Sequence, residues 1–433
     1  MSPTATNLRI NAERLWDTIM ETAQIGATAK GGVRRLTLSD LDRRVRDWFV
    51  AACRGAGCTV TVDDMGNIFA RRAGKNPALA PIGVGSHLDT QPTGGKFDGI
   101  IGVLSGLEVL RTLNDAGIET EAPIEIIDWT NEEGSRFAPA MLASGVFAGK
   151  FSRDYAYARA DREGKTFGEE LARIGYRGDA PCGAHPLAAF FEIHIEQGPI
   201  LEAEGKTIGV VTDVQGMRWY EVTVEGEDCH AGTTPMPMRK DALLASARMI
   251  TAVNAIGRRH APHAVATVGL IEASPNSRNV IPGKTFFTID IRHPEDAVLA
   301  TMEAEITGEL NAIAAASGVA LALERVWNSP PVPFARDCVA AVRDAARDLG
   351  LSWREIISGA GHDAAYVAAV APTAMIFVPC ERGVSHNELE KAEPDHVAAG
   401  ADVLLRAVLA TDARLADAAR AEGNGAWGKG EGG

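Results

Sequence analysis

The stretch PIGVGSHLDTQPTGGKFDGIIGVLSGLEVLRTLNDAG, residues 81–117, contains the unit on which the predicted fold is built. Its first six residues are apolar or small, which is typical of a buried strand, and residues 100–117 have the spacing of an amphipathic helix that ends at Gly117. Two further apolar segments, at 123–129 and 187–196, indicate more strands of the same kind. Strands that alternate with helices predict an α/β fold with a mostly parallel sheet covered by helices.

The sequence on either side of this unit predicts two domains. Helices are expected within the first fifty residues, followed by a hairpin at 58–72. After residue 212 the pattern becomes strand, helix, strand, strand, helix, strand, which is typical of a ferredoxin-like α+β sandwich. We therefore predict an α/β domain interrupted by an inserted domain, and a Gly-rich tail that is disordered. The boundaries are 1–212 and 329–415 for the two parts of the α/β domain, 213–328 for the insertion and 416–433 for the tail.

Composition sets limits on location and partners. The chain has 433 residues, of which 46% are hydrophobic and 23% charged, and its formal net charge is −14. This negative charge argues against nucleic acid and anionic membranes as partners. The N-terminus lacks the basic and apolar regions of a signal peptide, and no apolar stretch is long enough to span a membrane. The six cysteines form no C-x-x-C pair, so we expect reduced thiols and a cytoplasmic protein.

Four short segments place histidines and carboxylates just after predicted strands, where open α/β sheets bind their ligands. In the first segment, residues 85–99, His87 and Asp89 form an H-x-D pair, in which the carboxylate can orient a metal-binding imidazole. Asp98 precedes the helix and, taken alone, could equally cap it, while His87 could be an ordinary loop histidine. The glycines match neither G-x-G-x-x-G nor G-x-x-x-x-G-K-[ST], so no phosphate-binding loop is predicted.

The other segments add two histidines and a pair of glutamates. Glu132 and Glu133 are adjacent at a strand end, so one can bind a metal while the other faces a water; a solvated acidic turn is the alternative. His194 and Glu196 share one face of a strand, where His194 could also be a core residue. His386 follows the strand PTAMIFVP and could be an exposed loop residue. Together these groups suit Zn²⁺ and accept Mn²⁺, Co²⁺ or Ni²⁺, with enough ligands for two ions that share a carboxylate.

At this point the chain resembles a known family. The motifs GSHLDTQPTGGKFDG, TNEEGSRF, IEQGP, HAGTTPM, RNVIPG, GHDA and SHNE occur in the order expected for M20-type dinuclear metallohydrolases. The resemblance covers roughly residues 8–415 and is to the amidase branch, which includes N-carbamoyl-L-amino-acid hydrolase, β-ureidopropionase and allantoate amidohydrolase. The peptidase branch normally has an acidic ligand in place of His194, so this residue favours the amidase branch.

The resemblance implies a catalytic α/β domain that binds two divalent metal ions per subunit. The implied ligands are His87 and His194 for one ion, Glu133 and His386 for the other, and Asp98 as the bridge between them. Glu132 would act as general base and later as general acid, and Asp89 would orient His87.

The resemblance also implies that the inserted domain is a lid through which two subunits form a homodimer. His230 would stabilise the developing oxyanion, and Asn279 and Arg292 would bind the substrate carboxylate, since an arginine fork pairs with two oxygens at once. Gln197 would contact the ureido group, and His362 is expected near the crevice. Without the resemblance, His230 would be a surface-loop residue, Asn279 a turn residue and Arg292 a surface charge.

The expected function is hydrolysis of the N-carbamoyl (ureido) amide of a small substrate that carries a carboxylate, with release of the amino acid, CO₂ and ammonia. An aminoacylase or a dipeptidase on the same fold is the alternative enzyme. A metal-binding or dimer-forming protein without catalysis is the alternative of another class, but a structural site needs no spare carboxylate such as Glu132. The residues leave open which ureido substrate is used, which metal is native, and whether His230 acts in its own subunit or across the dimer.

Overall fold

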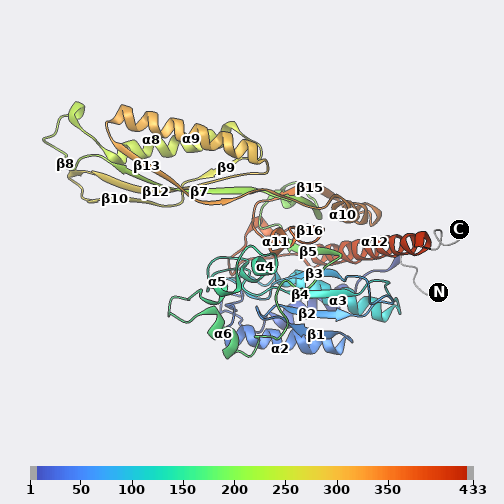
Figure 1. Ribbon diagram of the computed structural model, residues 1–433. Coiled ribbons are helices and arrows are strands. Elements are labelled where there is room, and N and C mark those ends of the chain that lie inside the picture. Colours follow the sequence, from blue (N-terminus) through green and yellow to red (C-terminus); the bar gives the residue numbers. More distant parts are fainter. Residues whose placement is uncertain (1–6, 427–433) are drawn as a thin grey trace, which may run out of the picture. The chain divides into compact units, whose positions relative to one another are not determined.

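The computed structural model describes residues 7–426, which form two compact units (Figure 1). The larger unit comprises Met1–Thr212 and Phe334–Gly433, and the inserted unit comprises Asp213–Pro333. The insertion therefore ends at 333 rather than at the predicted 328; its last long strand, β13 (Ala320–Ser329), already passes the predicted boundary by one residue. None of the helices in the described range combines the length and hydropathy needed to cross a bilayer.

The larger unit is built on a nine-stranded mixed sheet. Its centre consists of four strands that pair in parallel, in the order β4 (Ile124–Asp128), β3 (Ile82–Ser86), β5 (Ala189–Ile195) and β16 (Thr373–Val378). All residues of these four strands are buried, as expected of parallel strands covered on both faces.

The edges of this sheet differ from the centre. On one side lie β1 (Thr59–Val62) and β2 (Ile68–Arg72), which form the predicted antiparallel hairpin, and β2 pairs antiparallel with β4. On the other side are β6 (Ile208–Val214), β14 (Val332–Pro333) and β15 (Trp353–Ser358). Because β6 is antiparallel to both β16 and β14, the predicted mostly parallel arrangement describes the centre of the sheet and not its edges.

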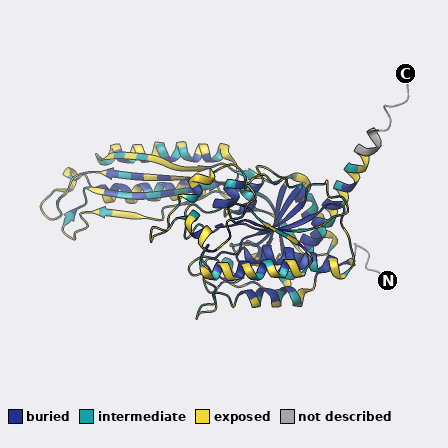
Figure 2. Cartoon of the chain, turned by 60° about the horizontal axis from the view of Figure 1, so that its bottom comes forward, coloured by how far each residue is buried: buried dark blue, intermediate teal, exposed yellow. Residues whose placement is uncertain are grey.

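Helices cover both faces of the large sheet, so that the buried strands lie between exposed outer helical surfaces (Figure 2). One layer consists of α1 (Ala12–Thr22), α3 (Ile100–Asp115), α10 (Arg336–Asp348) and α12 (Pro394–Ala426). The other layer includes α2 (Asp40–Gly55), α4 (Leu142–Phe147) and α11 (Asp363–Val367). Shorter helices lie in the connections, namely α5 (Arg153–Tyr157), α6 (Phe167–Arg173), α7 (Ile200–Ala203) and the 3₁₀ turn Glu381–Gly383.

The C-terminal helix corrects one prediction. We predicted disorder from residue 416, but α12 continues to Ala426. The sequence ADAARAE at 416–422 is rich in alanine and other strong helix formers, and Ala416 is buried, so the helix extends beyond the predicted boundary. Residues 427–433 of the predicted tail lie outside the described range.

The inserted unit is a five-stranded antiparallel sheet with α8 (Ala242–Arg259) and α9 (Asp296–Ser317) packed against it. The strand order is β10 (Ile271–Ser274), β12 (Lys284–His293), β7 (Gly216–Glu225) and β13, with β9 (Val265–Thr267) also beside β12. Alternate residues of β7 and β12 are buried, and these contribute to a core with α8 and α9. A separate ribbon pairs β8 (Cys229–His230) with β11 (Val280–Ile281), and a 3₁₀ turn follows at Met236–Met238.

A buried ion network joins three parts of the larger unit. Arg46 of α2 is fully buried and donates from Nε to Asp42 Oδ2 at 2.9 Å and from Nη1 to the carbonyl of Gly66 at 2.9 Å. Its Nη1 also lies 3.5 Å from Asp128 Oδ2, at the end of β4. The other oxygen of Asp128 accepts from the backbone N–H of Leu88 at 3.0 Å. The network thus connects α2, β4 and the loop that follows β3.

We predict that Arg46→Ala lowers the free energy of unfolding by about 3–5 kcal/mol, because two buried carboxylates would lose their counter-charge. Urea unfolding followed by circular dichroism measures this change. Arg44→Ala, at an exposed position of the same helix, is the matched control and should cost less than about 0.5 kcal/mol. Equal effects of the two substitutions would contradict a structural role for the network.

Candidate metal centre

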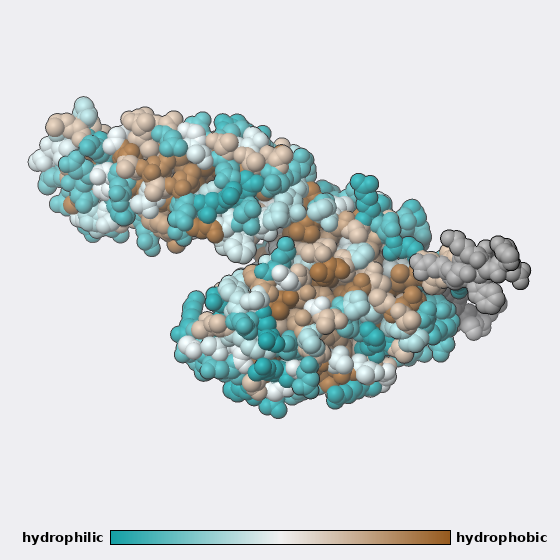
Figure 3. Space-filling model, in the orientation of Figure 1, coloured by the Kyte–Doolittle hydropathy of each residue, from teal (hydrophilic) through white to brown (hydrophobic). Residues whose placement is uncertain are grey.

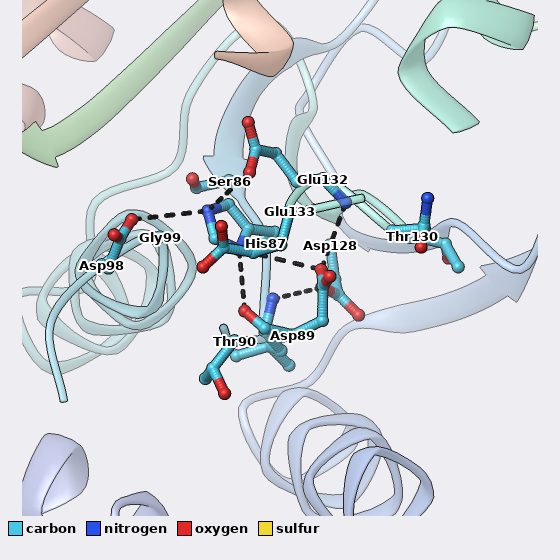
Figure 4. Close-up of polar contacts among 12 residues, drawn as sticks. Ser86, His87, Asp89, Thr90, Asp98, Gly99, Asp128, Thr130, Glu132 and Glu133 are labelled. Carbon is cyan, nitrogen blue, oxygen red and sulfur yellow. Dashed lines mark hydrogen bonds and ion pairs between the residues drawn. The ribbon is translucent and has the colours of Figure 1, made fainter. Parts of the chain in front are cut away.

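The candidate site lies where the carboxyl ends of the four central strands meet. His87 follows β3, residues 132–133 follow β4, His194 lies near the end of β5 and His386 lies in the loop after β16. Asp98 immediately precedes Gly99, the N-cap residue of α3. Parallel strands bring the loops at their carboxyl ends to one edge of the sheet, so these distant segments come together there. Figure 4 shows His87 in contact with Asp98 on one side and Glu132 on the other.

The first group of possible metal ligands is His87, Asp98 and His194, whose donor atoms lie within 4.8 Å of one another. Asp98 Oδ1 is 3.1 Å from His194 Nε2 and 3.8 Å from His87 Nε2. His87 Nδ1 donates to the carbonyl of Asp89 and His194 Nδ1 to that of Ile195, each at 2.9 Å. These bonds place a ring proton on Nδ1 of each histidine, so that each Nε2 faces the cluster.

Gly99 is required for this arrangement. It has a φ of 69°, and a Cβ at this position would lie 2.2 Å from His87 Nε2. Its backbone N–H donates to His194 Nε2 at 3.1 Å. Only glycine therefore allows α3 to begin this close to both imidazoles.

The second group is Asp98, Glu133 and His386, also with donor atoms within 4.8 Å. His386 Nε2 is 3.3 Å from Asp98 Oδ2 and 3.4 Å from Glu133 Oε2. Asp98 therefore offers one oxygen to each group. His386 is half exposed, whereas the first group is buried.

The chemistry of these groups fits divalent cations. Burial together with neighbouring carboxylates raises the pKa of both Glu132 and Glu133 well above the ordinary glutamate value, while burial lowers the pKa of His87 to about 4. Burial also opposes protonation of His194, but its contact with Asp98 outweighs this and raises the pKa to about 9. His87 Nε2 is buried and has no hydrogen-bond partner among the described residues. Zn²⁺ and similar ions bind imidazole nitrogens and carboxylate oxygens, and both kinds of ligand are gathered here.

Glu132 and Asp89 lie beside the first group without belonging to it. Glu132 Oε2 is 3.4 Å from His87 Nε2, and its backbone N–H donates to Asp89 Oδ1 at 3.2 Å. We predicted that the Asp89 carboxylate orients His87, but the ring Nδ1–H donates to the Asp89 backbone carbonyl instead. The carboxylate oxygen Oδ1 is 3.7 Å from His87 Nδ1 and supports the Glu132 turn instead.

Several further residues hold the cluster. Gln197, which we assigned to the substrate, donates to Asp98 Oδ2 at 3.0 Å. Gln91 was not predicted: its backbone and side-chain nitrogens donate to the two oxygens of Glu133 at 3.0 and 2.6 Å. The buried ring of His362 lies edge-on to His194, with ring centroids 4.5 Å apart. Gln91 lies two residues after the H-x-D motif, but this position does not by itself indicate a contact with Glu133.

The remaining predicted residues lie in the inserted unit. His230 is on β8, and the N–H of the next residue, Ala231, donates to the carbonyl of Asn279 at 2.9 Å, so this ribbon carries both predicted residues. Arg292 lies on β12, and its guanidinium pairs with Asp290 at 2.7 Å.

Comparison with known proteins identifies the family. Residues 83–410 match the family described as Peptidase family M20/M25/M40. This chain belongs to the M20 family. An N-carbamoyl-L-amino-acid amidohydrolase of Rhizobium meliloti is 54% identical to this M20 chain over 411 residues, which cover 95% of the chain and 99% of the relative. An allantoate amidohydrolase of Bacillus subtilis is 37% identical over 383 residues, covering 85% and 90%.

Solved structures agree with this assignment. An amidase of the hydantoinase/carbamoylase family from Burkholderia multivorans superimposes with a TM-score of 0.91 at 61% identity, covering 94% of this M20 chain and 98% of that one. The M20 family is metal-dependent, and the two groups described above are the candidate metal-binding residues of this member.

We predict that a chelator removes the metal and lowers hydrolytic activity at least ~10²-fold, and that added divalent ions restore it. Metal analysis and the thermal unfolding midpoint of His194→Ala check the site, because this variant should bind less metal and gain less stability from it. His263→Ala, which changes an exposed histidine of the inserted unit, should behave as wild type. Full metal content in His194→Ala would exclude the first group as a metal site.

Proposed function

We propose that this chain hydrolyses the N-carbamoyl amide of N-carbamoyl amino acids and releases the amino acid, CO₂ and ammonia. The observation that carries the proposal is the position of Glu132 beside two donor groups that share Asp98. A carboxylate in that position is available for proton transfer. The names of the relatives support an amide substrate with a ureido group.

The proposed site holds two divalent ions, Zn²⁺ or one of Mn²⁺, Co²⁺ and Ni²⁺. His87 and His194 would hold one, Glu133 and His386 the other, and Asp98 both. When bound, such ions polarise a carbonyl group and make a water molecule more acidic.

Glu132 would take a proton from the attacking water and deliver it to the nitrogen of the leaving amino acid. Its carboxylate is positioned for this by the backbone hydrogen bond to Asp89 and by contact with His87. The second product is a carbamate, which breaks down to CO₂ and ammonia.

Residues of the inserted unit would bind the substrate. His230 Nδ1 accepts from the backbone N–H groups of Gly232 and Thr233 at 3.1 and 3.2 Å, so the ring proton lies on Nε2, where it can be donated to an oxyanion. Asn279 and Arg292 would bind the substrate carboxylate and so align the scissile bond. Gln197 would contact the ureido group of the substrate. Its side chain already lies at the site, because it donates to Asp98.

The inserted unit is also the proposed lid and dimer interface. Exposed apolar side chains on this unit support the proposal, and apolar patches are visible on it in Figure 3. The exposed residues include Leu243, Leu244, Leu270 and Ile271. We also propose that the protein is cytoplasmic, because its six cysteines form no C-x-x-C pair and are expected to be reduced.

We predict that Glu132→Gln and Glu133→Gln, a matched pair of neighbours, fail in different ways. Glu132→Gln should lower kcat about 10²- to 10⁴-fold with metal content unchanged, because it removes a proton carrier. Glu133→Gln should lose one ion, because it removes a ligand. Metal analysis and steady-state kinetics distinguish the two. Loss of metal in Glu132→Gln would contradict its proposed role.

A substrate panel tests the proposed function directly. Metal-loaded protein is assayed for amine and ammonia release from an N-carbamoyl-L-α-amino acid, N-carbamoyl-β-alanine, allantoate, an N-acetyl amino acid and a dipeptide. We expect a ureido substrate to have the highest kcat/KM, and its carboxamide analogue to lose at least ~10-fold because it cannot pair with Arg292. Preference for the N-acetyl substrate or the dipeptide would favour the alternative enzyme, and inactivity on all five would favour a non-catalytic protein.

A further inference from the structure

Glu390 is a buried carboxylate that the proposed mechanism does not use. It lies four residues after His386 in the same loop and is 6% exposed. Its Oε1 accepts from the backbone N–H groups of Phe97 and Asp98 at 2.9 and 3.1 Å. One side chain therefore joins the loop that carries His386 to the backbone of the residue shared by both metal-binding groups.

The two loops also interlock sterically. A Cβ at Gly95 would lie 2.1 Å from Glu390 Oε1 and 2.4 Å from Glu390 Cβ, so the chain at this point packs directly on the glutamate. Two residues earlier in the same loop, Glu388 packs in the same way on a second segment, where a Cβ at Gly32 would lie 2.7 Å from Glu388 Cα. Both glycines therefore allow the loop that carries His386 to pack closely on neighbouring segments.

We expect the hydrogen bonds of Glu390 to affect the second group, which contains His386, more than the first group. Asp98 Oδ2 is 3.3 Å from His386 Nε2, and Glu390, four residues after His386, accepts from the Asp98 backbone N–H. In the first group, His194 lies within β5 and His87 directly follows β3, so neither depends on the loop that carries Glu390. Gly99 N–H provides a separate link from α3 to His194.

The second oxygen of Glu390 supports a role beyond loop stability. Oε2 is buried and has no hydrogen-bond partner among the described residues. Leaving a buried carboxylate oxygen unpaired is unfavourable, and an apolar contact would stabilise the loops without that cost. The hydrogen bond from the Asp98 backbone to Oε1 also fixes the position of a ligand shared by both groups, as residues outside the immediate ligands do in metal sites.

We propose that Glu390 is a positioning residue that sets the separation of Asp98 and His386 and thereby the affinity of the second group for its cation. The inference rests on the two-ion site of the proposed function. Residues outside the immediate ligands of a metal typically contribute about 10- to 100-fold to its affinity.

The test is a Mn²⁺ titration of the metal-free full-length protein, with free Mn²⁺ followed by electron paramagnetic resonance. We expect wild type to bind two ions. Glu390→Ala should bind the first within about 2-fold of wild type and the second about 10- to 100-fold more weakly. Glu390→Gln keeps an oxygen that can accept both N–H groups, so it should bind the second ion more tightly than Glu390→Ala.

Glu388→Gln is the matched control, because it changes the same residue type in the same loop, and the Glu388 carboxylate lies 3.5 Å from the exposed Lys30. Its two affinities should equal those of wild type. Wild-type affinity for the second ion in Glu390→Ala, or equal weakening of both ions, would overturn the inference. If circular dichroism shows that Glu390→Ala does not fold, Glu390→Asp replaces it in the titration. Its shorter carboxylate cannot reach both N–H groups, so it too should weaken binding of the second ion. Binding of a single ion by wild type would instead refute the two-ion site.

Discussion

The site depends on one shared carboxylate. Asp98 lies within hydrogen-bonding or ion-pair distance of three imidazoles that come from three different strands or the loops after them. Carboxylates buried this close together repel one another, and positive charge among them relieves that repulsion. The need to bring Asp98, the histidines and the two glutamates to one point explains why four loops converge at the same edge of the sheet.

Buried contacts of the larger unit fix these loops without taking part in the proposed reaction. The Arg46 network reaches Leu88, next to the first histidine, through Asp128 at the end of β4. Arg35 is also fully buried, and its guanidinium donates to the carbonyl of Leu88 at 3.1 Å. Buried arginines of this kind fix backbone positions, because several rigid N–H groups must be satisfied at once. The positions of the metal-binding side chains are therefore determined partly by residues far from them in sequence.

Local sequence patterns were sufficient for the elements with a single clear periodicity. The apolar runs of β3, β4, β5 and β16 predicted the parallel centre, and the spacing in 100–117 predicted α3. The antiparallel direction of β6 could not be predicted, because direction depends on the path of the chain and not on which residues are buried. The proposed ligands came from motif order and family resemblance. Gln91 and Glu390 were missed because each binds a partner on another loop, and no local pattern records such a contact.

The interruption of the larger unit has a consequence for biosynthesis. Its central sheet contains β16, which follows the insertion, whereas β3, β4 and β5 precede it. During synthesis, three central strands therefore leave the ribosome before their fourth neighbour exists, because about 180 further residues must be translated between the end of β5 and the end of β16. The insertion, being contiguous, can fold during that interval. His386 is synthesised last of the proposed ligands, so the second candidate group cannot form before synthesis is nearly finished.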